Sequence, residues 1–208
     1  MSNMVEAGLP QDVCPESGEW LFVDVGFSSK GKSCGLVSND DTPKVLTFAE
    51  ARASIIAAAA VNEAASRGNK ATLNLLIEAP LSVAFNERGN PTGRIFEKLE
   101  ERHRYWNEGG GCLVMTAAMY LLRALHDSKP RRKVRLFEGF VSFKEKGHAT
   151  SHCKDVEALR TVVLDHTRLH GMVLAPDKLA SNPSDKVVSA FAVAGMNFGV
   201  PSVVRTSA

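Results

Sequence analysis

The sequence predicts an α/β fold in which a mixed five-stranded sheet, made of a three-stranded antiparallel meander plus two parallel strands, is flanked by helices. Two observations carry this prediction. Three short apolar runs joined by tight turns follow residue 18, and helical and strand patterns then alternate along the chain. A doubly wound sheet would alternate strand and helix from its beginning, so the opening meander distinguishes the two architectures.

The meander is expected between Trp20 and Phe48. Its central strand is the apolar run Trp20–Gly26, and its second strand, Cys34–Ser38, follows a small, basic turn. Asn39–Pro43 is a strong turn sequence, because Asn, Asp and Pro favour tight backbone reversals. Lys44–Phe48 then provides the third strand.

Helices and parallel strands fill the rest of the chain. The alanine-rich segment Thr47–Arg67 predicts a helix that Gly68 and Asn69 end, and Thr72–Ile77 predicts a buried strand. Residues 82–95 contain Asn, Gly and Pro and predict a loop. The last strand is expected at Lys133–Phe143, and the remaining helices at Glu97–Tyr105, Leu113–His126, Asp155–His166 and Ser184–Gly195.

Length and composition are those of an ordinary globular protein. The 208 residues, of which 44% are hydrophobic, suit one domain over residues 19–208 preceded by a flexible leader over residues 1–18. No apolar run is long enough to cross a bilayer, and Met1–Glu19 has no signal-peptide pattern, so we expect a cytoplasmic protein without a membrane partner. The four cysteines lack paired spacing, which argues against a zinc knuckle or a disulfide framework.

One motif points to nucleotide binding. Gly26–Ser33 matches the phosphate-loop pattern G-x-x-x-x-G-K-S and follows a strand, so Lys32 would reach phosphates and Ser33 would hold magnesium. The motif requires a helix directly after Ser33, because the helix N-terminus completes the anion site. Only Cys34–Ser38 separates the motif from the next turn, so a hairpin turn fits better.

Two acidic residues occupy positions that favour metal binding. Asp24 lies within an apolar strand, where a carboxylate is costly unless it is paired or metal-bound. Glu78 ends the buried strand that should neighbour it in the sheet. Their carboxylates are therefore expected to share a Mg²⁺ or Mn²⁺ ion, since hard cations prefer carboxylate oxygen.

The third acid has two candidate positions. Asp185 opens the last predicted helix, where it either favours the helix dipole or brings a third ligand to the sheet edge. His152 and Asp155 lie three residues apart, a spacing that places both on one helical face. The sequence leaves open which helix completes the site.

Other polar residues are candidates for secondary roles. Glu138 lies in an apolar strand and is either a ligand or a partner for Lys144 or Arg135. Basic residues would hold the phosphate backbone of a nucleic acid, although solvated surface positions explain them equally well. The candidates for this substrate contact are Lys30, Lys32, Arg131, Arg132 and Lys144.

Four short motifs in this order resemble an uncharacterised family of predicted ribonuclease H-like nucleases. They are Val23–Gly26, Ile77–Leu81, Phe137–Phe140 and Ser184–Phe191. The wider superfamily includes the Holliday-junction resolvases, which use acids in the first strand, at the end of the fourth, and at the start of the last helix. The resemblance implies a ribonuclease H-like fold with Asp24, Glu78 and Asp185 as its metal ligands.

We therefore expect a metal-dependent nuclease that hydrolyses phosphodiester bonds in DNA or RNA. Water activated by the metal would attack the phosphate. The expected catalytic residues are Asp24, Glu78 and Asp185, with Glu138, His152 and Asp155 in support. Two alternatives remain: a nucleotide-binding NTPase or kinase that uses Gly26–Ser33, and a non-catalytic ribonuclease H-like binding domain. The apolar stretch Phe198–Val204 is either a sheet edge or an interface in a homo-oligomer.

Overall fold

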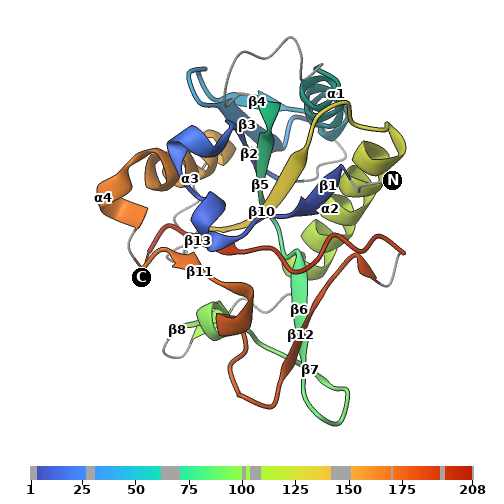
Figure 1. Ribbon diagram of the computed structural model, residues 1–208, viewed down its shortest axis with the longest axis vertical. Helices are drawn as coiled ribbons and strands as arrows, with labels where there is room; N and C mark the ends of the chain where they lie inside the picture. Colours follow the sequence, from blue (N-terminus) through green and yellow to red (C-terminus); the bar gives the residue numbers. More distant parts are fainter. Residues whose placement is uncertain are drawn as a thin grey trace.

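The protein has an α/β fold built on an eight-stranded mixed sheet, with two smaller antiparallel sheets beside it (Figure 1). The computed structural model describes residues 4–26, 31–61, 71–99, 102–103, 109–141, 151–169, 171–192 and 195–207. The main sheet follows the order β11-β13-β10-β5-β2-β3-β4, and β1 pairs with β10 outside this path. The α/β class and the mixed sheet are confirmed.

The centre of the main sheet consists of the strands expected from the sequence. The antiparallel meander is formed by β2 (Glu19–Asp24), β3 (Cys34–Ser38) and β4 (Lys44–Leu46). β5 (Leu73–Glu78) pairs in parallel with β2, and β10 (Val134–Phe140) pairs in parallel with β5. Each begins and ends within a few residues of its predicted bounds.

Three further strands extend the sheet beyond β10. β1 (Val5–Ala7) lies in the segment expected to be a flexible leader, yet it pairs with the first half of β10 and buries Val5. β13 (Val203–Arg205) pairs with the second half of β10 and with β11 (Val173–Leu174). Of the apolar C-terminal stretch, Val203 and Val204 are therefore buried in the chain's own sheet, and Phe198 is buried beside it.

Alternation along the strands divides the core between the two faces of the sheet. Leu21 and Val23 point to the face covered by α1 (Phe48–Ala59) and α2 (Gly110–Asp127). Trp20 and Phe22 point to the face covered by α3 (His152–Leu164). Because successive strand residues face opposite sides, each strand feeds both cores. Figure 1 shows α1 and α2 on one side of the sheet and α3 with α4 (His166–Leu169) on the other.

The helices begin at recognisable caps. Thr47 and Glu50 form a capping box at the start of α1, in which each side chain accepts a hydrogen bond from the other's backbone N–H. The Ser151 hydroxyl accepts a hydrogen bond from the Lys154 N–H, so α3 begins at His152, three residues earlier than expected. No helix in the described part of the chain is both long and apolar enough to cross a membrane.

Two predicted helices are wrong within the described residues. Where Ser184–Gly195 was expected to be helical, β12 (Lys186–Ser189) pairs antiparallel with β6 (Ser82–Phe85). The β-branched pair at the centre of β12 suits a strand, and β6 supplies the backbone partners that a local helix would otherwise provide. The expected helix at Glu97–Tyr105 is replaced, over its described part, by a 3₁₀ turn (Ile95–Glu97) and the paired strands β8 (Lys98–Leu99) and β9 (Arg102–His103).

The small sheet β12-β6-β7 also corrects the loop expected at residues 82–95. β7 (Pro91–Thr92) pairs antiparallel with β6, and an isolated bridge joins Arg94 to Ala180. Figure 1 shows this sheet below the main one, directly following β5. It therefore adjoins the edge of the main sheet where β5 ends.

Candidate metal centre

Asp24 and Glu78 end two neighbouring parallel strands. Asp24 is the last residue of β2, Glu78 is the last residue of β5, and the two are direct partners in the β2–β5 register. Glu78 shares a strand face with Leu76, and Asp24 shares one with Phe22, so both carboxylates lie on the α3 side of the sheet. Both residues are buried: Asp24 is 4% exposed and Glu78 is 8% exposed.

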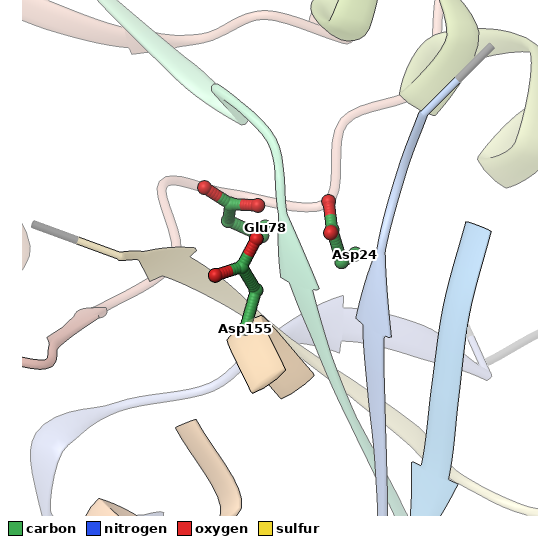
Figure 2. Close-up of side chains that lie close together, drawn as sticks. All are labelled: Asp24, Glu78 and Asp155. Carbon is green, nitrogen blue, oxygen red and sulfur yellow. The ribbon is translucent and has the colours of Figure 1, made fainter. Parts of the chain in front are cut away.

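The first turn of α3 brings Asp155 to the same place. Asp155 is 1% exposed, and its carboxylate lies with those of Asp24 and Glu78 so that one oxygen of each falls within 4.8 Å of the others. Figure 2 shows the three side chains converging from β2, β5 and the start of the helix. Gly35 permits this approach, because a Cβ there would lie 2.4 Å from the backbone oxygen of His152.

The three carboxylates form a group that can hold a metal ion. Ionised carboxylates this close repel one another unless a cation lies among them. Magnesium ligands at about 2.1 Å from the ion lie about 3 Å apart when adjacent and about 4.2 Å apart when opposite, so these oxygens would draw closer together to share one ion. The donor set consists of oxygen alone, which favours Mg²⁺ or Mn²⁺ over softer metals.

His152 is the first residue of α3 and contacts the group directly. Its Nδ1 lies 2.6 Å from Asp24 Oδ2, and its side chain is 39% exposed. When Asp24 is ionised its carboxylate only accepts hydrogen bonds, and Nδ1 is then the donor in this contact. The imidazole is therefore oriented by the acid beside it.

The carboxylates Asp24 and Glu78 and the His152 ring line a cleft of about 670 Å³. Its lining also includes Gly109–Gly111, at the N-terminal end of α2. Phe140, the last residue of β10, also lines the cleft. A cleft of this size is within the usual range of ligand sites in proteins.

Glu138 does not belong to the carboxylate group. Alternation along β10 places it on the face of Leu136, opposite to the face that carries Glu78. Its partner is Arg94, whose NH1 donates to Glu138 Oε2 at 2.7 Å, rather than Arg135. Lys144, the other expected partner, lies outside the described residues.

Charges around Arg94 shift the ionisation of this buried pair. Burial raises the pKa of Glu138 above its ordinary value, and the nearby Arg94 only partly opposes this effect. Burial lowers the pKa of Arg94, but the charges of Glu138 and Glu97 outweigh it and raise that pKa overall. The two shifts thus have different causes: burial for the pKa of Glu138, and the two neighbouring carboxylates for the pKa of Arg94.

Asp185 lies away from the three acids. It directly precedes β12 in the small sheet, where its Oδ2 accepts hydrogen bonds from Thr92 Oγ1 at 3.0 Å and from Asn182 Nδ2 at 3.3 Å. It is neither in the metal-binding group nor among the residues that line the cleft. Of the two candidate positions for the third acid, the fold therefore brings Asp155 rather than Asp185 to the sheet edge.

The basic residues expected to hold a substrate have different locations. Arg132 is fully buried, its NH1 lies 2.7 Å from Glu19 Oε2, and Glu19 begins β2 at the end opposite to Asp24. At 3.3 Å per residue, Glu19 and Asp24 are about 16 Å apart. Contrary to expectation, Arg132 and its exposed neighbour Arg131 thus lie away from the cleft. Lys32 is exposed, and Lys30 and Lys144 lie outside the described residues.

The phosphate-loop motif lacks its helix. Ser33 donates its backbone N–H to the Leu46 carbonyl, and strand β3 follows at once, so a hairpin takes the place of the strand-to-helix turn that nucleotide binding needs. The Cys34 thiol donates to the Gly26 carbonyl at 3.1 Å, and burial raises the pKa of that thiol. Residues 27–30 lie outside the described chain.

Sequence reasoning missed Arg94, which lines the cleft and is 1% exposed. Its only local signal is the spacing Arg94-x-x-Glu97, where Arg94 NH2 lies 2.7 Å from Glu97 Oε1.

Comparison with known proteins finds no relative: no family model, curated protein or solved structure matches the chain.

Proposed function

We propose that this protein is a metal-dependent nuclease that hydrolyses phosphodiester bonds in DNA or RNA. One observation carries the proposal: carboxylates from β2, β5 and α3 gather within 4.8 Å of one another, next to a cleft. This is the donor chemistry that Mg²⁺ and Mn²⁺ require, and those ions support phosphodiester hydrolysis.

The strand order supports a ribonuclease H-like architecture for this activity. The segment β4-β3-β2-β5-β10 combines an antiparallel meander with two parallel strands, which is the arrangement that the motif resemblance implies. The proposed site also resembles that of the superfamily in its origin, since Asp24 and Glu78 end β2 and β5, the first and fourth of these five strands in chain order. Because a fold hosts many functions, the proposal depends on the carboxylates rather than on the fold.

The proposed roles follow from position. Asp24, Glu78 and Asp155 would hold the cation, which would activate water and stabilise charge on the phosphate. His152 contacts Asp24 and lines the cleft, so its ring would hold Asp24 in place and exchange a proton with water in the cleft. The scissile phosphate would enter the cleft between these acids and the start of α2.

A cleavage assay tests the proposal. Single-stranded and duplex DNA and RNA would be incubated with wild type in Mg²⁺, in Mn²⁺ and in chelator, alongside Asp24→Asn. We expect metal-dependent cleavage that falls about 100-fold or more in Asp24→Asn, because the variant loses a charged ligand. Asp185→Asn is the matched control, since it makes the same change outside the carboxylate group, and it should keep wild-type activity.

Three outcomes would count against the proposal. Absence of cleavage with every substrate and metal, together with retained nucleic-acid binding, would favour the non-catalytic binding domain. Cleavage that Asp24→Asn leaves intact would place the active site elsewhere. ATP binding that is lost in Lys32→Ala would instead revive the nucleotide-binding alternative.

A further inference from the structure

Glu138 is a buried acid that the proposed chemistry does not use. It is 1% exposed and lies on the face of β10 opposite to the three carboxylates. Its Oε2 accepts two hydrogen bonds, one from Arg94 NH1 at 2.7 Å and one from the backbone N–H of Leu81 at 2.9 Å. The second bond ties the acid to the chain just after Glu78.

The segment between Glu78 and Ser82 connects β5 to β6, and polar contacts hold it at several points. The Ala79 N–H donates to the Ile77 carbonyl at 2.9 Å, which bends the chain as it leaves β5. Leu81 is bound by Glu138, and the Ser82 hydroxyl accepts from Arg94 NH1 at 2.8 Å. Direct contacts from Glu138 and Arg94 therefore fix two consecutive residues of this bend.

The guanidinium of Arg94 is itself held firmly. Its NH2 donates to Glu97 Oε1 at 2.7 Å, its backbone N–H donates to Glu97 Oε2 at 2.7 Å, and it lies over the Phe96 ring. Arg94 and Glu97 are each 1% exposed, so these charge-assisted contacts are shielded from water. The bend is thus braced against a rigid, buried network.

A neighbouring glycine indicates how tightly β10 packs against Glu78. A Cβ at Gly139 would lie 2.6 Å from Leu76 Cδ2 and 3.4 Å from Glu78 Cα. β10 therefore packs closely against the end of β5 that carries Glu78. Truncation of Glu138 would leave the buried N–H of Leu81 without this acceptor, and the bend would relax to recover a partner.

We propose that Glu138 is a positioning residue for the metal site. It fixes the Glu78–Ser82 bend and so keeps the Glu78 carboxylate close to those of Asp24 and Asp155. The inference rests on the proposed function, because it assumes that these three acids bind a cation. Residues that orient metal ligands without touching the metal commonly affect affinity 10- to 100-fold, as a general order of magnitude.

Mn²⁺ titration of the full chain tests the proposal, with affinity measured by calorimetry at a temperature where each variant is folded. We expect Glu138→Ala to weaken Mn²⁺ binding roughly 10-fold or more. Glu138→Gln keeps an oxygen acceptor for the Leu81 N–H and should retain affinity within roughly 3-fold. Leu125→Ala is a matched buried truncation near the far end of α2, and it should lower thermal stability while leaving Mn²⁺ affinity unchanged.

Glu138→Asp decides the case if the alanine variant does not fold. The aspartate keeps a buried carboxylate, but its side chain is shorter by one methylene group, so the acceptor is withdrawn from the Leu81 N–H. Glu138→Asp should therefore weaken Mn²⁺ binding as well. Wild-type Mn²⁺ affinity in folded Glu138→Ala or Glu138→Asp would overturn the positioning role alone. A loss of Mn²⁺ affinity in Leu125→Ala as large as that in Glu138→Ala would do the same. No Mn²⁺ binding by wild type would overturn the metal site itself and this inference with it.

Discussion

Asp24 and Glu78 are directly paired across the parallel strands β2 and β5, each as the last residue of its strand. Both carboxylates therefore leave the sheet at the same edge and on the same face. The two acids need no loop to bring them together, because the register of the sheet does so. Asp155 from α3 completes the group of three carboxylates that could hold a cation.

Metal binding should stabilise the folded protein. Because the three acids converge only in the native state, Mn²⁺ at 100 times its dissociation constant should raise the free energy of unfolding by about 2.7 kcal/mol. Denaturant unfolding with Mn²⁺ or with chelator measures this difference. Asp155→Asn should largely abolish the gain and Asp185→Asn should keep it; equal gains in both would exclude Asp155 as a ligand.

Removal of one acid should stabilise the metal-free protein. Asp155→Asn preserves side-chain shape and removes a negative charge from three buried carboxylates within 4.8 Å of one another. We expect the free energy of unfolding in chelator to increase, on the order of 1 kcal/mol, since like charges this close repel. Chemical denaturation in chelator checks the sign, and a clear decrease would mean that the carboxylate group is not repulsive.

Gly35 should control how closely α3 approaches the sheet. Gly35→Ala places a methyl group 2.4 Å from the His152 carbonyl and should push the first turn of α3 outward. We expect a loss of about 1–3 kcal/mol in stability, together with weaker Mn²⁺ binding, because Asp155 moves with that turn.

Gly31→Ala is the matched control for this substitution. It makes the same change in the same hairpin, but among the described residues no atom lies within 4 Å of the added Cβ. It should therefore leave Mn²⁺ affinity unchanged in calorimetry. If Gly35→Ala also binds Mn²⁺ like wild type, the packing of β3 against α3 does not position Asp155.

Glu138 should make stability depend on pH. Burial raises its folded-state pKa and the nearby Arg94 only partly opposes this, so the native protein holds the Glu138 proton at pH values where the unfolded chain has released it. The contribution of Glu138 is therefore most favourable below its unfolded pKa and is lost as pH rises through the folded pKa.

Glu138→Gln removes this titration while keeping an acceptor in place. As pH rises above the ordinary pKa of a glutamate, the free energy of unfolding of wild type should fall relative to that of Glu138→Gln. Parallel urea denaturation series across pH measure it. A pH-independent difference would show that burial does not raise the pKa of Glu138.

The central strands and their two acids were predictable because their signals are local. Apolar runs of strand length mark β2 and β5, and the meander order makes these strands neighbours. Once the strands are neighbours, acids at their ends must meet. By contrast, Ser184–Gly195 contains a plausible helix start, but antiparallel pairing with β6 overrides that preference and carries Asp185 into the small sheet.

Local sequence patterns were thus sufficient to predict the α/β class, the five central strands and the Asp24–Glu78 pair. Tertiary structure alone decided that Asp155 completes the group and that Glu138 pairs with Arg94, 44 residues away. The physical reason is the range of the interactions. Hydrophobic periodicity and turn preferences act over a few residues, whereas the approach of α3 and the burial of Arg94 depend on packing between distant segments, which no local pattern encodes.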